Sequence, residues 1–314
     1  MMSMKIALVG IGEIARNQHV PTLNASSDWD LAATCSRQGT VDGVESFSNF
    51  SQMLDTRSDI TTISFCLPPV PRFAYAAQAI RAGRHVMLEK PPGATLSECQ
   101  TLQAMARDAG VSIYATWHSR EAAQVDAAKA WLTDKKINRL TITWKEDVRR
   151  WHPGQTWIWK AGGLGVFDPG INALSILTKI LPDPVHLSSA ELFVPENCET
   201  PIAADLTFAH PGGAEMTANF DFRQEGEQIW SIDIETDAGR LVLSEGGAKL
   251  SIDGVAQAEV DKAGNPLIGE YPRLYAKMAD LVRSGGVDMD LSPIAHVADA
   301  FLLARRKTVE PFYE

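Results

Sequence analysis

A glycine-rich turn near the amino terminus constrains the fold of this chain more than any other feature. The apolar run 5–9 (Lys-Ile-Ala-Leu-Val) leads into residues 10–15 (Gly-Ile-Gly-Glu-Ile-Ala), which have the spacing G-x-G-x-x-A. Between a strand and a helix, the first glycine permits a tight turn, the second lets the backbone approach a pyrophosphate, and the small third residue allows close packing. The helix start then offers free N–H groups to the phosphates. We therefore expect a dinucleotide at Gly10, Ile11, Gly12, Glu13 and Ile14.

Short apolar runs alternate with helical segments over the first part of the chain. Strands are expected at 5–9, 31–35, 60–67, 85–88 and 111–115, and helices at 12–25 (bent at Pro21), 72–82 and 96–109. This alternation predicts βαβ units and a parallel sheet. Beyond about residue 120, alternating apolar and polar residues at 140–144, 203–208, 215–222 and 228–234 predict an antiparallel sheet with one covered face.

Four further helices are expected after residue 120, at 121–132, 171–181, 271–282 and 294–306, with Arg305-Arg306-Lys307 in the last turn. A length of 314 residues suits about two domains. We therefore predict an α/β protein with an N-terminal Rossmann dinucleotide-binding domain over 1–119. A C-terminal substrate-binding α/β domain with a large, mostly antiparallel sheet should follow over 120–314, its C-terminal helix able to pack back on the first domain.

Composition and charge exclude several classes of partner. The net charge is −10 and no basic run of five residues occurs, which argues against nucleic acid. No apolar run reaches the ~18 residues of a membrane span. Four scattered cysteines indicate reduced thiols and a cytoplasmic location. His118 and Glu121 lack a second pair of ligands at a suitable spacing, so we expect no metal site.

The end of the second strand indicates which dinucleotide binds. Sites that prefer NAD usually place Asp or Glu there, whereas residues 35–37 are Cys-Ser-Arg. Ser36 can donate to a 2′-phosphate and Arg37 can pair with it, which favours NADP, with NAD as a second cofactor. The structural alternative is a turn serine beside a solvated arginine. Leu67, Pro68 and Glu89, at the ends of later strands, complete the expected cofactor contacts.

Two further motifs carry a family resemblance. Glu89-Lys90-Pro91 follows the strand at 85–88, and residues 161–168 are Ala-Gly-Gly-Leu-Gly-Val-Phe-Asp. With the amino-terminal motif they resemble the glucose–fructose oxidoreductase / inositol dehydrogenase / MocA family over essentially the whole chain. Segments 151–155 (Trp-His-Pro-Gly-Gln) and 167–174 (Phe-Asp-Pro-Gly-Ile-Asn-Ala-Leu) are similar to those of its bacterial L-arabinose and D-galactose 1-dehydrogenases.

The resemblance implies an NAD(P)-dependent aldose 1-dehydrogenase that oxidises the anomeric carbon to a lactone by hydride transfer to the nicotinamide. Lys90 matches the family lysine beside the nicotinamide and the reacting hydroxyl, and Asp168 matches the acid of a D-x-x-x-H motif. Asn172 replaces the frequent histidine, which moves the role of proton acceptor toward Asp168. The reaction needs such a base and a group that stabilises negative charge on oxygen, so we expect Lys90 and Asp168 to converge on one anomeric centre.

Asn172, four residues after Asp168 on a helix, is expected to bond the same hydroxyl or hold the carboxylate. The structural alternatives are a helix N-cap for Asp168 and a surface lysine for Lys90. Six tryptophans lie within residues 117–159, and aromatic rings suit sugar C–H faces. Substrate contacts are therefore expected from His118, Glu146, Trp151, His152 and Trp230, each with a purely structural alternative.

The same sequence features are also compatible with other functions. Regulators of the same fold bind sugar and nucleotide without catalysis, although they do not need the lysine and acid pair. A polyol or trans-dihydrodiol dehydrogenase is a further alternative, with Asn172 speaking against an inositol substrate. The outer face of the second sheet is expected to pack against something, and a second copy of the chain, forming a homodimer through that sheet, is one alternative.

Overall fold

The computed structural model describes residues 3–258 and 269–313 and divides into two compact units. The first contains Met1–His118 and Glu270–Leu291, and the second contains Ser119–Gly269 and Ser292–Glu314. The helix Glu270–Ser284 thus belongs to the first unit, although the residues before it in sequence belong to the second. The expected division into 1–119 and 120–314 stays a prediction about domains.

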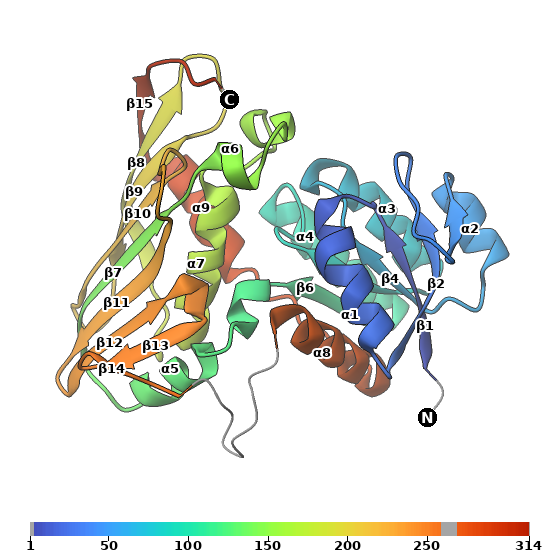
Figure 1. Cartoon of the computed structure of the whole chain (residues 1–314), viewed down its shortest axis with the longest axis horizontal. Helices are drawn as coiled ribbons and strands as arrows, with labels where there is room; N and C mark the ends of the chain where they lie inside the picture. The colour runs from blue at the N-terminus through green and yellow to red at the C-terminus, as the bar shows by residue number, and fades with distance from the viewer. Residues whose placement is uncertain (1–2, 259–268, 314) are drawn as a thin grey trace. The chain divides into compact units, whose positions relative to one another are not determined.

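A six-stranded parallel sheet forms the centre of the first unit (Figure 1). Its order is β3-β2-β1-β4-β5-β6, with every neighbouring pair parallel. The strands are β1 (Met4–Val9), β2 (Trp29–Cys35), β3 (Glu45–Phe47), β4 (Thr62–Phe65), β5 (His85–Glu89) and β6 (Ile113–Thr116). The order reverses between β1 and β4, where sheets of this kind bind their ligands at the carboxyl ends of the strands.

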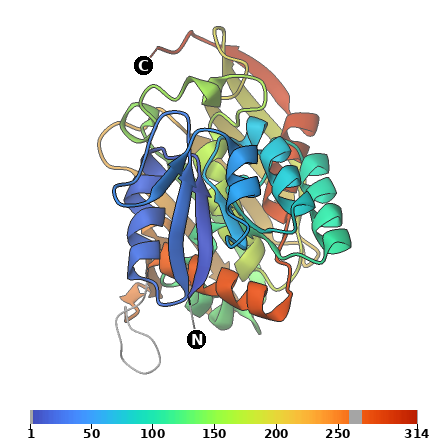
Figure 2. The ribbon, with the colours of Figure 1, turned by 90° about the vertical axis from the view of Figure 1, so that its right-hand side faces the viewer.

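Helices cover both faces of this sheet (Figure 2). On one face lie α3 (Pro69–Arg81) and α4 (Leu96–Ala109), and on the other lie α1 (Val20–Ala25) and α8 (Glu270–Ser284), while the short α2 (Phe50–Thr56) follows β3. Ile6 and Leu8 of β1 pack in one buried cluster with Tyr271 and Tyr275 of α8. This packing explains why α8 joins the first unit.

A nine-stranded sheet dominates the second unit, in the order β14-β13-β12-β11-β7-β10-β9-β8-β15. Its neighbours are antiparallel except for the parallel pairs β7–β10 and β8–β15. The strands are β7 (Ile137–Lys145), β8 (His186–Pro195), β9 (Ala203–Ala209), β10 (Glu215–Asp221), β11 (Ile229–Thr236), β12 (Gly239–Ser244), β13 (Lys249–Ile252), β14 (Val255–Ala256) and β15 (Arg305–Val309). The predicted fold class is confirmed.

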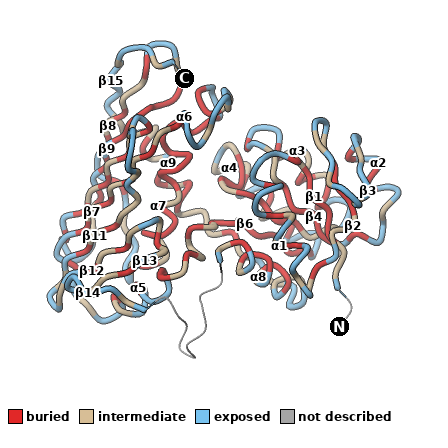
Figure 3. Tube along the Cα trace, viewed as in Figure 1, coloured by how far each residue is buried: buried red, intermediate tan, exposed pale blue. Residues whose placement is uncertain are grey.

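Helices α5 (Val125–Leu132), α7 (Phe167–Ile180) and α9 (Ser292–Leu303) lie on one face of this large sheet, and α6 (Val148–Trp151) is a short turn beyond β7 (Figure 1). Along β7, Leu140, Ile142 and Trp144 are buried, whereas Thr141 and Thr143 are half-buried. The alternation follows from the two-residue period of a strand. Among the described residues, no helix of this unit covers the opposite face (Figure 1), and along the strands buried residues alternate with more exposed ones (Figure 3).

The helix expected at 12–25 is present over 13–25 and contains a π-helical turn, Ala15–His19, before α1. The structure corrects the ends of two other helices. The one expected at 121–132 begins at Val125. The helix expected at 294–306 ends at Leu303. The prediction that Arg305-Arg306-Lys307 form the last helical turn is wrong, because these residues lie on the edge strand β15. Pairing with β8 supplies their backbone hydrogen bonds, and Lys307 forms an ion pair with Glu191 at 2.8 Å.

In the part of the chain that the structure describes, every helix is too short or too polar to cross a bilayer. The same residues contain no group of three or more His, Cys, Asp or Glu side chains arranged to hold a metal ion.

Candidate functional site

The glycine-rich turn lies at the carboxyl end of β1. Gly10 has a φ of +91°, and a Cβ atom there would lie 3.1 Å from the Cys66 and Leu67 backbone, so this position requires glycine. A Cβ on Gly12 would meet nothing within 4 Å. The protein therefore leaves open space where the motif brings a pyrophosphate close to the backbone, and the residues present fit a dinucleotide. Glu13 and Ile14 are exposed beside this space, and Ile11 is buried.

The loop after β2 holds the predicted determinants of the cofactor type. Ser36 is half-buried and its hydroxyl accepts a hydrogen bond from the Gln38 N–H at 3.3 Å, while Arg37 is exposed. A Cβ on Gly39 of the same loop would lie 2.7 Å from Nη2 of Arg16. A second arginine, which the sequence analysis did not single out, therefore lies beside the loop.

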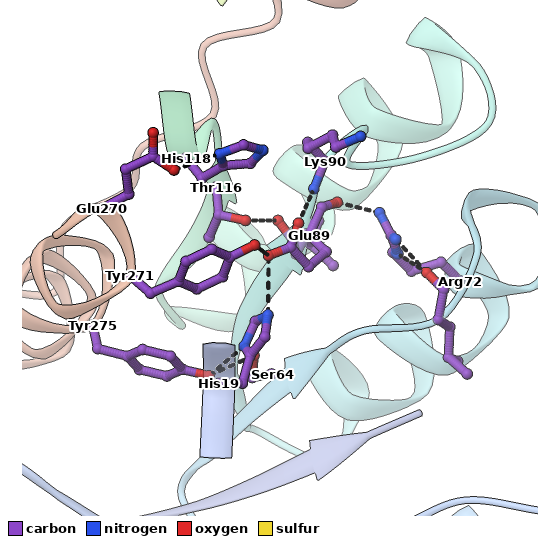
Figure 4. A network of polar contacts seen from close by, with 12 residues as sticks. His19, Ser64, Arg72, Glu89, Lys90, Thr116, His118, Glu270, Tyr271 and Tyr275 are labelled. Atoms are coloured by element: carbon purple, nitrogen blue, oxygen red, sulfur yellow. Dashed lines mark hydrogen bonds and ion pairs between the residues drawn. The ribbon is translucent and has the colours of Figure 1, made fainter. Parts of the chain in front are cut away.

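Glu89 is the centre of a buried polar network (Figure 4). Its Oε1 accepts from the Tyr271 hydroxyl at 3.1 Å and lies 3.0 Å from His19 Nε2, and its Oε2 accepts from the Lys90 backbone N–H at 2.9 Å. On the other side of His19, Nδ1 lies 2.7 Å from the Tyr275 hydroxyl. The network fixes the backbone at which Lys90 begins.

Charge within the network favours the ionised form of both Glu89 and His19. Burial raises the pKa of Glu89, but the hydrogen bond and charge of His19, together with the charges of His118 and Arg72, outweigh it and bring the pKa to about 2. Burial likewise lowers the pKa of His19, yet Cys66, Tyr275 and the bond to Glu89 raise it well above its usual value. Together the two groups form an ion pair inside the first unit.

His118, predicted to bind substrate, lies close to this network. Its Nδ1 is 2.8 Å from Glu270 Oε2, and its ring stacks on Tyr271 with centroids 5.9 Å apart. Burial lowers the pKa of His118, but the charge and hydrogen bond of Glu270, together with the charge of Glu89, raise it above its usual value. His118 and Lys90, both half-buried, also interact, because the charge of Lys90 lowers the pKa of His118.

In the second unit, His152 brings two buried carboxylates together. Its Nε2 lies 3.6 Å from Glu146 Oε1 and 3.5 Å from Asp168 Oδ2. The other oxygen of Glu146, Oε2, accepts from the Trp230 indole N–H at 2.8 Å. Trp151 is exposed and packs edge-on against Trp230 with centroids 5.5 Å apart. Four predicted substrate residues and the predicted acid Asp168 therefore form one cluster.

Close backbone approaches position Asp168. A Cβ at Gly163 would collide with carbonyl oxygens of residues 157 and 158, and one at Gly165 with the Pro201 carbonyl, so glycine is required where the chain enters α7. Asp168 is the second residue of α7 and is 3% exposed. The N-cap alternative for Asp168 is wrong, because Val166 holds that position and no side chain caps the helix. Asn172, one turn later, is half-buried.

Several residues of these two clusters were not predicted as site residues from the sequence. His19 and Tyr271 contact Glu89, and Tyr275 contacts His19, from segments far apart in the chain, and no local pattern connects them. Gln228 is a further example, since its Oε1 accepts from the Asp147 N–H at 2.6 Å and the Trp151 indole at 3.2 Å. Asn172 stands where the family frequently has histidine, and His152 instead places an imidazole 3.5 Å from Asp168.

Comparison with known proteins agrees with these observations. Residues 4–116 match the family described as "Oxidoreductase family, NAD-binding Rossmann fold". Galactose 1-dehydrogenase of Pseudomonas fluorescens is 42% identical over 318 residues, covering 100% of both chains. The crystal structure of a D-galactose-1-dehydrogenase from Rhizobium etli has a TM-score of 0.94 and 51% identity, covering 100% of this chain and 99% of the other.

A more distant likeness concerns the fold alone. A 3-ketoreductase from Actinomadura kijaniata, crystallised with NADP and TDP-benzene, has a TM-score of 0.84 at 18% identity, covering 98% of this chain and 99% of the other. Three findings lead to one conclusion. They are the 42% identity to a known enzyme over the whole length of both chains, the match of residues 4–116 to the Rossmann family, and the glycine-rich turn after β1. This chain is an NAD(P)-dependent oxidoreductase of the glucose–fructose oxidoreductase / inositol dehydrogenase / MocA family.

Proposed function

We propose that the chain is an aldose 1-dehydrogenase that oxidises C1 of D-galactose, L-arabinose or both to the lactone. The observation that carries this proposal is the cluster of Glu146, His152 and Asp168 with two tryptophans, because it combines acceptors for sugar hydroxyls with an aromatic surface. The full-length identity to a galactose 1-dehydrogenase supports the same substrate class.

Each residue has a task that its surroundings suit. Asp168 accepts the proton of the C1 hydroxyl, and His152, 3.5 Å away and half-buried, passes it toward solvent. Lys90 stabilises the negative charge that grows on the same oxygen. Bound NAD(P)⁺ supplies the acceptor for the hydride that leaves C1. The C–H electron pair thus leaves with the hydride, the O–H proton goes to carboxylate, and the C1–O bond becomes a carbonyl.

The remaining cluster residues hold the sugar in place. Glu146 keeps Oε1 near His152 while the Trp230 N–H occupies Oε2, so Oε1 is the oxygen oriented toward vicinal hydroxyls. Trp151 and Trp230 offer ring faces and edges to the C–H side of a pyranose. Asn172 and His118 are proposed to donate to further hydroxyls.

NADP is the proposed preferred cofactor, with NAD as a second one. Residues 35–37 contain no carboxylate, and Arg37 and Arg16 both lie at the loop that follows β2. Two guanidinium groups suit a 2′-phosphate, since each can form paired hydrogen bonds to its oxygens.

The decisive experiment follows absorbance at 340 nm with NADP⁺ or NAD⁺ and a panel of aldoses, polyols and a trans-dihydrodiol. We expect turnover with D-galactose or L-arabinose and a higher kcat/KM for NADP⁺. Turnover with a polyol or dihydrodiol alone would replace the proposed substrate class. If no compound is oxidised while sugar and nucleotide still bind, the chain is a sensor of the same fold.

We also propose that two copies associate through the open face of the nine-stranded sheet. The expected cytoplasmic location stays a prediction.

A further inference from the structure

Arg72 is a buried cation that none of the steps above uses. It lies in the first turns of α3 and is 2% exposed, which places it among the largest fully buried side chains of the described residues. A guanidinium stays protonated in proteins, so burying it is costly unless its donors find acceptors. The partners of Arg72 therefore need an explanation.

These partners are backbone carbonyl groups from two neighbouring strand ends. Nε donates to the Leu67 carbonyl at 3.1 Å, and Nη2 donates to the same oxygen. Nη1 donates to the carbonyls of Glu89 and Pro91. Leu67 follows β4 and Glu89 ends β5, so one side chain ties together the carboxyl ends of the two strands (Figure 4).

The carbonyls of Glu89 and Pro91 lie immediately before and after Lys90. The Lys90 N–H itself donates to Glu89 Oε2 at 2.9 Å, and that carboxylate is held by His19 and Tyr271. Arg72 therefore holds the backbone carbonyls of the residues on either side of Lys90, and the Glu89 carboxylate holds the Lys90 amide N–H. The Lys90 side chain starts from a backbone with little freedom to move.

We infer that Arg72 is a positioning residue that fixes Lys90 and the loop at Leu67 relative to each other. The inference rests on the proposed function, in which the Lys90 ammonium must meet one oxygen atom. A small displacement of such a group costs much of its effect on rate. Arginine suits the task because its rigid fork reaches several acceptors at once, whereas an ammonium is a point donor on a flexible stem.

The test compares Arg72→Lys with a matched control, Arg84→Lys. Arg84 belongs to the same unit but donates to the Ser58 carbonyl at 3.0 Å, in the loop that precedes β4. We expect Arg72→Lys to lower kcat about tenfold or more, because a misplaced catalytic group loses much of its effect. The dissociation constant of NADP⁺ should change less than about threefold, and the isotope effect with C1-deuterated sugar should rise to its full value as hydride transfer becomes limiting. The control should keep all three values.

Hydrogen exchange gives a readout that does not depend on activity. In Arg72→Lys, peptides covering 66–68 and 88–96 should exchange faster while the rest of the first unit is unchanged. Unchanged exchange in these peptides, or equal acceleration throughout the unit, would overturn the positioning role. A fall in melting temperature without a change in kcat would overturn it as well.

Arg72→Gln serves as a second variant if Arg72→Lys does not fold. Should neither fold, Arg72 acts in the stability of the whole unit and the inference fails. A wild-type protein that oxidises no aldose would remove the proposed function instead, and the exchange experiment would still decide whether Arg72 holds the two strand ends.

Discussion

Glu146 and Asp168 are both buried carboxylates, yet their neighbours suit them to different tasks. Glu146 has one oxygen bonded to the Trp230 indole at 2.8 Å, which orients it as a fixed acceptor. Asp168 lies 3.5 Å from Nε2 of His152, a ring nitrogen that can donate or accept a hydrogen bond. The proposed function therefore assigns sugar binding to Glu146 and proton acceptance to Asp168, although both carboxylates lie near the same histidine.

The first prediction concerns this separation. Asp168→Asn should lower kcat for aldose oxidation about 100-fold or more, because the amide accepts no proton at the pH of the assay. Glu146→Gln should act mainly on KM, since it removes a charged acceptor but not the base. Steady-state kinetics with D-galactose and L-arabinose measures both. Asp183→Asn, on an exposed loop of the same unit, is the control. A kcat within about threefold of wild type for Asp168→Asn would assign the base to another group.

Gly10 and Gly12 give a second prediction, because the two glycines are required for different reasons. Gly10→Ala should destabilise the protein by about 1–3 kcal/mol, since alanine is strained at a φ of +91° and its Cβ would press on the next strand. Gly12→Ala should leave the melting temperature unchanged, because its Cβ meets no protein atom within 4 Å. It should instead weaken NADP⁺ binding about tenfold by occupying the space for the pyrophosphate.

Calorimetric melting and titration with NADP⁺ separate the two effects. A Gly12→Ala protein that binds NADP⁺ as wild type does would place the pyrophosphate elsewhere.

At the level of secondary structure, local signals predicted the elements that depend on local interactions. The glycine motif predicted the turn after β1, and the alternating runs predicted β7, β9, β10 and β11. The π-helical turn Ala15–His19 was missed, because the inward position of His19 is stabilised by Tyr275 of α8, which lies 256 residues away. Strand β15 was missed for a similar reason, since its basic residues show no alternation and its pairing partner β8 is distant in sequence.

The His19–Glu89 ion pair predicts how stability depends on pH. The pKa of Glu89 is lowered to about 2, so its contribution is present above about pH 4.5 and is lost as the pH falls toward 2. The pKa of His19 is raised, so its contribution is complete below about pH 6.5 and is lost as the pH rises through the raised value. The pair therefore stabilises the first unit most at about pH 5–6.

Melting temperatures of wild type and Glu89→Gln, measured from pH 3 to pH 9, check this dependence. The difference in melting temperature should be largest at about pH 5–6, where it corresponds to roughly 2–3 kcal/mol of unfolding free energy. It should shrink at both ends of the pH range. His186→Gln, at the start of β8 on the surface, should follow wild type throughout. A difference that stays constant with pH would mean that Glu89 stabilises the unit without an ion pair.

On the scale of the whole molecule, each cluster gathers residues from distant parts of the chain. Glu89 is 182 residues from Tyr271, and Trp230 is 84 residues from Glu146. The family motifs identified Lys90 and Asp168 because these residues follow recognisable local patterns. Other residues of the two clusters, such as Arg72 at the carbonyls on either side of Lys90 and Gln228 at the Trp151 indole, have no such pattern and are found only when tertiary contacts are known.

The open face of the nine-stranded sheet carries the last prediction. At its centre, Thr217 of β10 lies opposite Thr141 of β7, and Asn219 lies opposite Thr143. These short, uncharged side chains are half-buried, whereas Arg139 and Glu215 at the next position along the strands are exposed and form an ion pair at 3.2 Å. These short, uncharged side chains are bordered by charged residues, among them Asp205 opposite Asn219 and Asp233 opposite Thr141. A small uncharged patch with a charged border suits face-to-face packing of two identical sheets, in which each patch meets its own copy.

Sedimentation velocity should therefore show a dimer for the wild-type chain. Thr217→Lys should give a monomer, because a two-fold axis brings the two new charges close together in a desolvated interface. Thr133→Lys, an exposed position at the end of α5, adds the same charge to the same unit and should remain dimeric. If Thr217→Lys keeps the sedimentation coefficient of wild type, the copies associate through another surface or not at all, and the polar centre of the sheet faces water.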